Sequence, residues 1–358
     1  MATFPTTIRI RKEASPMPAH FALMLLGLVA LVAPAGAVEV MSASQLAQAL
    51  GFDGAAQKKL LVGEIVSVER EETTAKQLAV SIGMLVKGDP EALAAAVLDG
   101  QTLEANPAIL GFGKIDPSAP EAGLAGVAFT SGEVDEIRKL LELEAGDEFN
   151  LSADELATLQ EAIARLDPSQ AEDPAVVQAV NGAYRSVLLG RLQAYLARGV
   201  AGIAPYQRAG GVSDPAEDLR AAADASQLLQ QAAPDLYRGL VDFPEHQPAE
   251  VQQAFFWVKE VANDRPVFSL SHRMVQRRPD GLILLSRTFY AGHSFNASLS
   301  GAGVVPVQSA SAVFYTNRTA SDQVAGFMQA MRHELGRGMM RDALIESLRA
   351  IRTRFGGG

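Results

Sequence analysis

The sequence contains no cysteine, a single tryptophan and few aromatic residues, which make up 6% of its 358 positions. The absence of cysteine excludes a disulfide scaffold, a thiolate zinc site, a cysteine nucleophile and a lipoprotein anchor. An excess of positive charge is also missing, since the formal net charge is −10. Because phosphate binding needs clustered Lys and Arg, no nucleic-acid partner is expected.

The chain also lacks a hydrophobic run long enough to span a bilayer, which takes roughly 20 residues. Its longest uninterrupted apolar run covers only residues 21–33. That run follows a basic leader at residues 9–12 and precedes three small residues at 35–37. This three-part pattern is typical of a secretory signal peptide. We therefore expect residues 1–37 to be a signal peptide cleaved near Ala37 and the protein to be periplasmic or secreted, with an uncleaved membrane anchor as the alternative.

Apolar residues make up 48% of the chain, which is enough for a hydrophobic core and excludes wholesale disorder. After the leader, the pattern divides the chain into three parts. Residues 38–130 mix strands with a short helix over 91–98, residues 131–238 are helical, and residues 239–358 contain strands and then one long helix. The predicted strands cover 63–70, 78–86, 109–115, 124–129, 255–261, 267–276, 282–291 and 304–316.

Start and stop signals mark the predicted helices. Residues 152–155 (SADE) form a capping box, and Asp-Pro pairs at 173 and 214 open two further helices. Gly199 ends the longer of these two, before a Gly-rich connector over 199–211. The C-terminal helix is predicted from about residue 319 to 354, because an apolar stripe of helical period runs through this range.

This order of elements resembles the helix-grip fold of START-like ligand-binding proteins. Residues 78–100 are similar to the opening strand and helix of that family, and residues 267–354 are similar to its closing strands and gripping helix. The resemblance covers under half of the chain after the leader, and residues 131–238 would be a helical insertion or subdomain. The whole chain also resembles secreted bacterial proteins of no known function. The family resemblance implies an α+β fold, in which an antiparallel curved sheet and the long C-terminal helix enclose an apolar cavity.

The candidate ligand-binding residues lie in the last third of the chain. Strand alternation places His272 on an apolar face together with Phe268, Leu270 and Met274. A histidine among such neighbours is either a core residue held by a backbone hydrogen bond or a polar anchor in a ligand pocket.

A second polar group follows along the next predicted strand. Arg287 shares a strand face with Phe289, Tyr290 falls on the other face, and His293 and Asn296 come where the strand ends. Arginine offers a planar fork to a carboxylate or phosphate, while tyrosine and asparagine offer directed hydrogen bonds. We predict that these residues orient the polar end of a ligand. The alternative is a solvated strand end.

Other chemistry is less well supported by the residues. Residues 292–296 (GHSFN) resemble the G-x-S-x-G nucleophile elbow of serine hydrolases, but the last position is Asn and no helix signal follows. The histidines show no metal-ligand spacing. We therefore assign no catalytic residue, no metal and no cofactor.

Three functions stay open at this point. We expect an exported soluble protein that binds an apolar or amphipathic, lipid-like small molecule between the sheet and the C-terminal helix. The alternatives are an envelope protein–protein interaction module without a ligand cavity, and a hydrolase-type enzyme that uses His272 or His293 as general base in the same pocket. Residues 265–358 carry twelve Arg and no Lys against five acidic residues, so peripheral contact with a membrane or envelope protein is also open, beside pairing within the fold.

Overall fold

The computed structural model describes residues 42–146, 148–326 and 328–356, which belong to one compact unit. The predicted signal peptide and its cleavage site lie outside the described residues. Within the described ranges, no helix has both the length and the apolar composition needed to cross a membrane.

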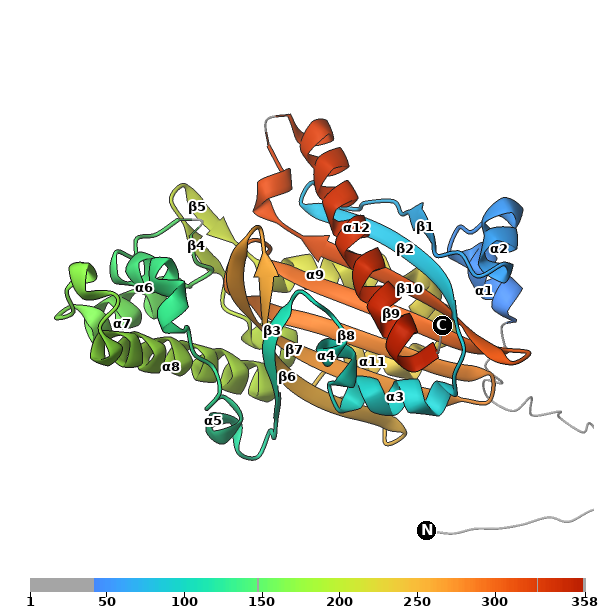
Figure 1. The fold of residues 1–358 in the computed structure, drawn as a ribbon, viewed down its shortest axis with the longest axis horizontal. Helices are drawn as coiled ribbons and strands as arrows, with labels where there is room; N and C mark the ends of the chain where they lie inside the picture. The colour runs from blue at the N-terminus through green and yellow to red at the C-terminus, as the bar shows by residue number, and fades with distance from the viewer. Residues whose placement is uncertain (1–41, 147, 327, 357–358) are drawn as a thin grey trace, which may run out of the picture. The chain divides into compact units, whose positions relative to one another are not determined.

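Eight strands form the central sheet, and all of their pairings are antiparallel. They are β1 (Val66–Glu69), β2 (Gln77–Val86), β3 (Ile109–Ile115), β6 (Val251–Ala262), β7 (Arg265–Arg278), β8 (Gly281–Ala291), β9 (Ala297–Val307) and β10 (Ala310–Ala320). Their order in the sheet is β1-β2-β10-β9-β8-β7-β6-β3 (Figure 1). Two short strands, β4 (Tyr206–Arg208) and β5 (Gly211–Ser213), form a separate ribbon.

Twelve α-helices occur in the described residues, and several begin at capping signals of the sequence. They are α1 (Ala43–Ala49), α2 (Gly54–Leu61), α3 (Pro90–Leu98), α4 (Gln101–Glu104), α5 (Pro120–Gly123), α6 (Val134–Leu141), α7 (Ala153–Ile163), α8 (Pro174–Arg198), α9 (Pro215–Asp224), α10 (Gln227–Ala232), α11 (Pro234–Val241) and α12 (Gln329–Gly356). Asp89, Asp173 and Asp214 cap α3, α8 and α9 through their side chains, each directly before a proline. Together with the sheet, these helices confirm the predicted α+β class with a long C-terminal helix.

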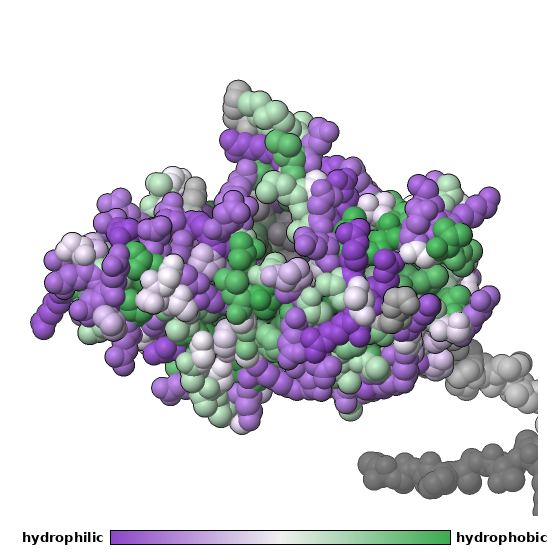
Figure 2. All heavy atoms as spheres, viewed as in Figure 1, coloured by the Kyte–Doolittle hydropathy of each residue, from purple (hydrophilic) through white to green (hydrophobic). Residues whose placement is uncertain are grey.

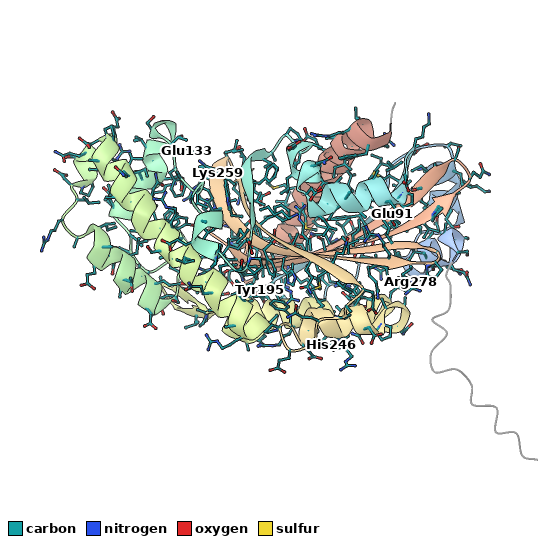
Figure 3. The ribbon with its side chains drawn as sticks, turned by 90° about the horizontal axis from the view of Figure 1, so that it is seen from below. Glu91, Glu133, Tyr195, His246, Lys259 and Arg278 are labelled. Carbon is teal, nitrogen blue, oxygen red and sulfur yellow. The ribbon has the colours of Figure 1, made fainter. Side chains whose placement is uncertain are left out.

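Helices cover both faces of the sheet (Figures 1 and 3). One face carries α3 and α12, whose apolar side chains share a core cluster with β2, β7 and β8. The other face carries α8, α9 and α11, and a larger cluster joins residues of the helical part to β6–β9. Tyr195 of α8 lies in this second interface, between its helix and the sheet (Figure 3). Because both faces are buried, strand alternation cannot tell which helix covers which face.

One predicted strand is wrong. Residues 124–129 form a loop, although Val127 and Phe129 are buried. The backbone N–H and C=O of Phe129 are bonded to the side chain of Asn181 in α8, at 2.7 and 2.9 Å. A helix side chain thus satisfies the backbone groups that a neighbouring strand would otherwise pair with.

The C-terminal region differs from its prediction in two places. The predicted strand 304–316 is the meeting point of two strands, β9 and β10, which a tight turn at residues 308–309 joins. The first half of β9 was missed because its Ala, Ser and Gly residues are poor strand formers. The last helix begins at Gln329 rather than near 319, since Thr319 belongs to β10 and Ser321 caps only a short 3₁₀ turn.

Candidate functional site

The predicted site residue His272 is buried on the sheet face opposite α12. Its Nδ1 lies 2.9 Å from the hydroxyl of Tyr195, its Nε2 lies 2.8 Å from Oε1 of Gln253, and the ring of Phe255 stacks on it. Burial, followed by the positive charge of Arg287, holds the pKa of His272 well below its usual value. The side chain is therefore a neutral imidazole with both nitrogens engaged, which is the environment of a core histidine.

Arg287 is buried on the same face and donates a hydrogen bond to the backbone carbonyl of Leu240. It borders a cavity of about 450 Å³ between α9 and α11. The lining of this cavity also contains Asp224, Asp242 and Glu245. Arg198 and Arg220 also line the cavity, so three arginines balance the three carboxylates and the net charge of the lining does not favour an anionic ligand.

Tyr290 also lies on this face, so its predicted position on the other face is wrong. The register between β7 and β8 shifts between Leu270 and Ser271, which leaves Phe289 as an extra residue in a β-bulge. Phe289 and Tyr290 consequently both enter the core beneath α8. There the hydroxyl of Tyr290 lies 3.0 Å from that of Tyr184.

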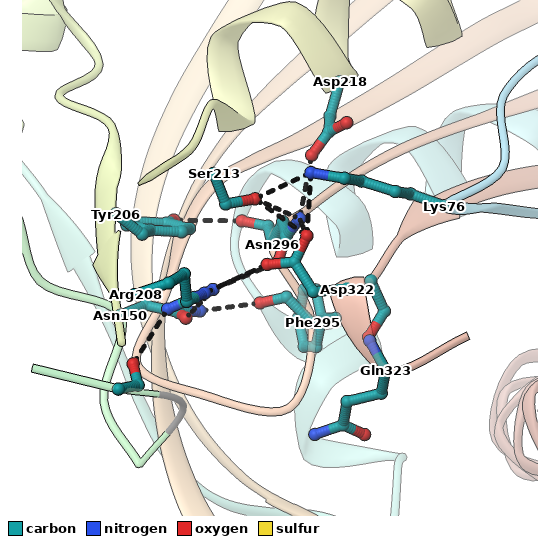
Figure 4. Close-up of polar contacts among 12 residues, drawn as sticks. Lys76, Asn150, Tyr206, Arg208, Ser213, Asp218, Phe295, Asn296, Asp322 and Gln323 are labelled. Atoms are coloured by element: carbon teal, nitrogen blue, oxygen red, sulfur yellow. Dashed lines mark hydrogen bonds and ion pairs between the residues drawn. The ribbon is translucent and has the colours of Figure 1, made fainter. Parts of the chain in front are cut away.

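Asn296 belongs to a polar network that joins α9, the β4–β5 ribbon and the segment after β10 (Figure 4). Its amide nitrogen donates to Asp218, Ser213 and Asp322 at 2.9, 3.0 and 3.3 Å, and its side-chain oxygen accepts a hydrogen bond from Arg208 at 3.4 Å. Every polar atom of the Asn296 side chain therefore has a protein partner.

His293 pairs with the serine that follows it. Its Nδ1 lies 2.7 Å from Oγ of Ser294, and its Nε2 lies 3.1 Å from the carbonyl oxygen of Pro266. Burial lowers the pKa of His293. Ser294 has a φ of +71°, as expected for a strained turn that presents a hydroxyl.

The two backbone N–H groups that follow Ser294 are not free to stabilise an oxyanion. Both are already used, because Phe295 donates to the carbonyl of His293 and Asn296 donates to that of Ala320. The chain then enters β9 instead of a helix. The His293–Ser294 pair therefore offers a base and a hydroxyl, but the N–H groups after the serine do not stabilise an oxyanion. Among the described residues, no three His, Asp or Glu side chains are grouped to hold a metal ion.

A cavity of about 630 Å³ lies on the other face, between the sheet and α12. Figure 2 shows the surface hollowed beside this helix. None of the five predicted ligand-binding residues lines this α12 cavity. The sequence prediction thus placed a cavity beneath the C-terminal helix but selected side chains from the opposite face of the strands.

The sheet wall of the α12 cavity consists of two polar rows followed by apolar ones. The first polar row runs across four paired strands and consists of Ser271, Thr288, Ser298 and Thr319. The second polar row, two positions along each strand, consists of Arg273, Ser286, Ser300 and Asn317. All eight residues line the cavity. The next positions are Val275, Leu284, Ala302 and Tyr315, and the row after them is apolar on β8–β10.

The helix wall of the cavity is apolar except for Ser347. Leu344, Leu348 and Ile351 of α12 face Met84 and Val313 of the sheet in one core cluster. The first half of α12 lies close to the polar end of the strands. A Cβ on Gly336 there would come within 3.1 Å of the side chains of Leu78 and Val324. Leu78 is the β2 partner of Thr319, so this approach occurs at the level of the first polar row.

Arg273 is the one arginine that lines the α12 cavity among the described residues, and it is 7% exposed. Its Nη1 donates to the carbonyl of Val97 at 2.9 Å and to Oγ1 of Thr102 at 3.3 Å, and the guanidinium lies over the ring of Phe256. Its buried Nε has no hydrogen-bond partner. Burial lowers the pKa of Arg273 to about 10, so the side chain remains a cation at neutral pH.

Glu260 and Tyr315 are the other ionisable groups in the lining. Burial raises the pKa of Glu260 to about 7. Tyr315 accepts a hydrogen bond from Asn317 at 3.5 Å, and burial raises its pKa. Near pH 7 the lining therefore contains one full positive charge and one carboxyl group that is partly protonated.

A second large cavity, of about 520 Å³, lies against α1 and α10. Its arginines include Arg278, which forms an ion pair with Asp280 at 3.1 Å and also donates to the carbonyl of Ala232. The lining of this second cavity contains none of the described buried polar atoms that lack a hydrogen-bond partner, whereas the α12 lining contains two, on Arg273 and Ser271, so we take the α12 cavity as the candidate site.

Of the twelve arginines in residues 265–358, six form ion pairs with carboxylates within the described residues, and four of these pairs are long-range. In these four pairs the carboxylate partners come from earlier parts of the chain: Arg265 with Glu136, Arg277 with Glu91, Arg337 with Glu72 and Arg354 with Glu104. Pairing within the fold therefore accounts for part of the charge asymmetry in the sequence.

Comparisons with protein families, with curated proteins and with solved structures found no match to this chain. The resemblance to START-like proteins consequently stays a prediction, and the function must be argued from the α12 cavity itself. The signal for this site was present in the sequence as polar residues spaced two apart: residues 269–273 (SLSHR), 286–288 (SRT), 298–300 (SLS) and 317–319 (NRT).

Proposed function

We propose that this protein is an exported carrier that binds an amphipathic, lipid-like small molecule in the α12 cavity. The observation that supports this most directly is the division of one cavity into a polar part and an apolar part. A volume of about 630 Å³ is within the range of small-molecule sites. A ligand with a polar end and an apolar body would match both halves at once, whereas water or a purely polar solute would leave the apolar half unused.

The surface of the helical part does not favour the interaction-module alternative. Of the described residues between 131 and 238, Val212 is the one large hydrophobic side chain that is prominently exposed. A docking surface normally presents a contiguous apolar patch. The hydrolase alternative is weakened because the two backbone N–H groups that follow Ser294 are already bonded.

Mass spectrometry of the protein, purified without detergent, tests the carrier proposal. We expect an additional mass under native conditions that denaturation releases and organic solvent extracts. Ser347 is half-buried and lines the cavity from α12, so Ser347→Phe should occupy part of the cavity and reduce or abolish the additional mass. Ala330→Phe on the exposed start of the same helix should not. An adduct that both variants retain would contradict the proposal, as would a clean mass for the unmodified protein after incubation with dodecanol.

A further inference from the structure

Two buried hydrogen-bond donors without partners lie on adjacent same-face positions of β7. They are Nε of Arg273 and Oγ of Ser271, whose residues are 7% and 4% exposed. A buried donor without a partner destabilises the folded state, so such donors are rare in folded proteins unless a ligand or water satisfies them. Both side chains line the α12 cavity. An acceptor bound at the polar end of the cavity would satisfy these donors after a small rotation of either side chain.

That acceptor should carry a negative charge. Arg273 is a buried cation, and no ion pair with a carboxylate is found for it among the described residues. Its contacts are a carbonyl oxygen, a hydroxyl and an aromatic ring, none of which neutralises the charge. An unpaired buried charge is costly, and an anion that accepts from the guanidinium fork removes that cost.

The charge of the anion is limited by the rest of the lining. Arg273 is one cation, and Glu260 adds a carboxyl group to the same cavity. A dianion such as a phosphate monoester would leave one negative charge uncompensated beside this single cation. A carboxylate monoanion matches the single positive charge. The hydroxyl groups of the two polar rows supply further donors around it.

We propose that Arg273 and Ser271 bind the carboxylate of a fatty-acid-like amphiphile whose alkyl chain lies in the apolar half of the cavity, beneath α12. This inference rests on the carrier function proposed above and names its ligand class. The polar rows adjoin the apolar rows along the strands, so a single unbranched molecule spans both parts. The chain then packs against Leu344 and Leu348, and the carboxylate lies beside β7.

Calorimetry at pH 7.5 with three twelve-carbon probes below their micelle concentrations tests the headgroup assignment. The probes are laurate, dodecanol and dodecyl phosphate. Because a hydrogen bond to a charged group contributes about 1.5–3 kcal/mol, laurate should bind at least roughly tenfold more tightly than dodecanol. Laurate should also bind more tightly than dodecyl phosphate. Equal affinity for laurate and dodecanol would overturn the headgroup assignment but leave the carrier function standing, whereas failure of all three to bind would count against both.

Variants locate the preference on the residues proposed. Arg273→Met should remove the preference for laurate over dodecanol while dodecanol still binds. Arg277→Met is the matched control, since Arg277 lies four residues along the same strand, outside the cavity and paired with Glu91. If Arg273→Met does not fold, Ser271→Ala should still weaken laurate binding several-fold without affecting dodecanol. A preference that survives in Arg273→Met, or that is undiminished in Ser271→Ala when only that variant folds, refutes the assignment.

Discussion

Glu260 should make the stability of the protein fall as the pH rises through neutrality. Its carboxyl lines the α12 cavity, and no described residue donates a hydrogen bond to it. Burial raises its pKa from the model-compound value of 4.5 to about 7. The folded state therefore holds the proton of Glu260 more tightly than the unfolded state does. The stabilisation from this proton is fully present below pH 4.5 and is lost as the pH passes through 7.

The size of the effect follows from the same pKa values. A shift from 4.5 to about 7 corresponds to about 3 kcal/mol of unfolding free energy. Water in the cavity screens the carboxylate, so this is an upper value. Glu260→Gln keeps the shape of the side chain but does not titrate. We expect it to equal the wild type near pH 4.5 and to exceed the wild type by up to about 3 kcal/mol at pH 8.5.

Urea unfolding of both proteins between pH 4.5 and 8.5 measures this difference. In the unfolded state His272 and His293 also titrate in this range, but they are common to both proteins and cancel in the comparison. Glu91→Gln provides a control, because Glu91 is an exposed carboxylate paired with Arg277 (Figure 3) and its removal should cost under about 1 kcal/mol. Parallel stability profiles for the wild type and Glu260→Gln would refute the reasoning.

Three further predictions address the face opposite α12, the serine beside His293 and the leader. Tyr195→Phe removes the hydroxyl bonded to His272 and should lower the unfolding free energy, measured in urea, by about 1–3 kcal/mol. Laurate binding should not change. A changed laurate affinity would mean that the sheet face covered by α8 takes part in ligand binding. A fluorophosphonate probe should leave Ser294 unlabelled, because the two backbone N–H groups that follow it are already bonded, and labelling that Ser294→Ala abolishes would restore the hydrolase alternative. Expressed with its leader in a bacterial host, the protein should be recovered outside the cytoplasm with a mass that begins at Val38, and retention of residues 1–37 would contradict the expected export.

Local signals predicted the elements well where they were strong. The Asp173-Pro174 pair and Gly199 bound α8, and the predicted strand 109–115 agrees with β3. Local sequence signals gave wrong secondary structure where contacts with distant segments determine the backbone conformation. Asn181 satisfies the backbone of a loop that was expected to be a strand, and the small residues of β9 are held in the sheet by two neighbouring strands.

The candidate site was harder to predict than the fold for a definable reason. His272 and Arg273 are adjacent, so strand alternation assigns them to opposite faces. The large apolar neighbours of His272 led to the prediction that the ligand pocket lies on the His272 face. Both faces are buried, and only the positions of α8 and α12 show that Arg273 lines the α12 cavity. The Ser and Thr residues around Arg273 come from four separate sequence segments, and only the cross-strand register shows that they form continuous rows on one face.

The spacing of the rows also relates positions along the cavity to the length of a bound alkyl chain. Consecutive rows on one face are two residues apart on every strand, which is about 7 Å in an antiparallel sheet. The border between the second polar row and the apolar rows runs across the strands, so the distance from this border to the far end of the cavity determines how long an alkyl chain can be accommodated. Replacing Ser286, Ser300 and Asn317 by apolar residues would move the border by one row. The same sheet could thus be adapted to ligands of another chain length without any change in its backbone.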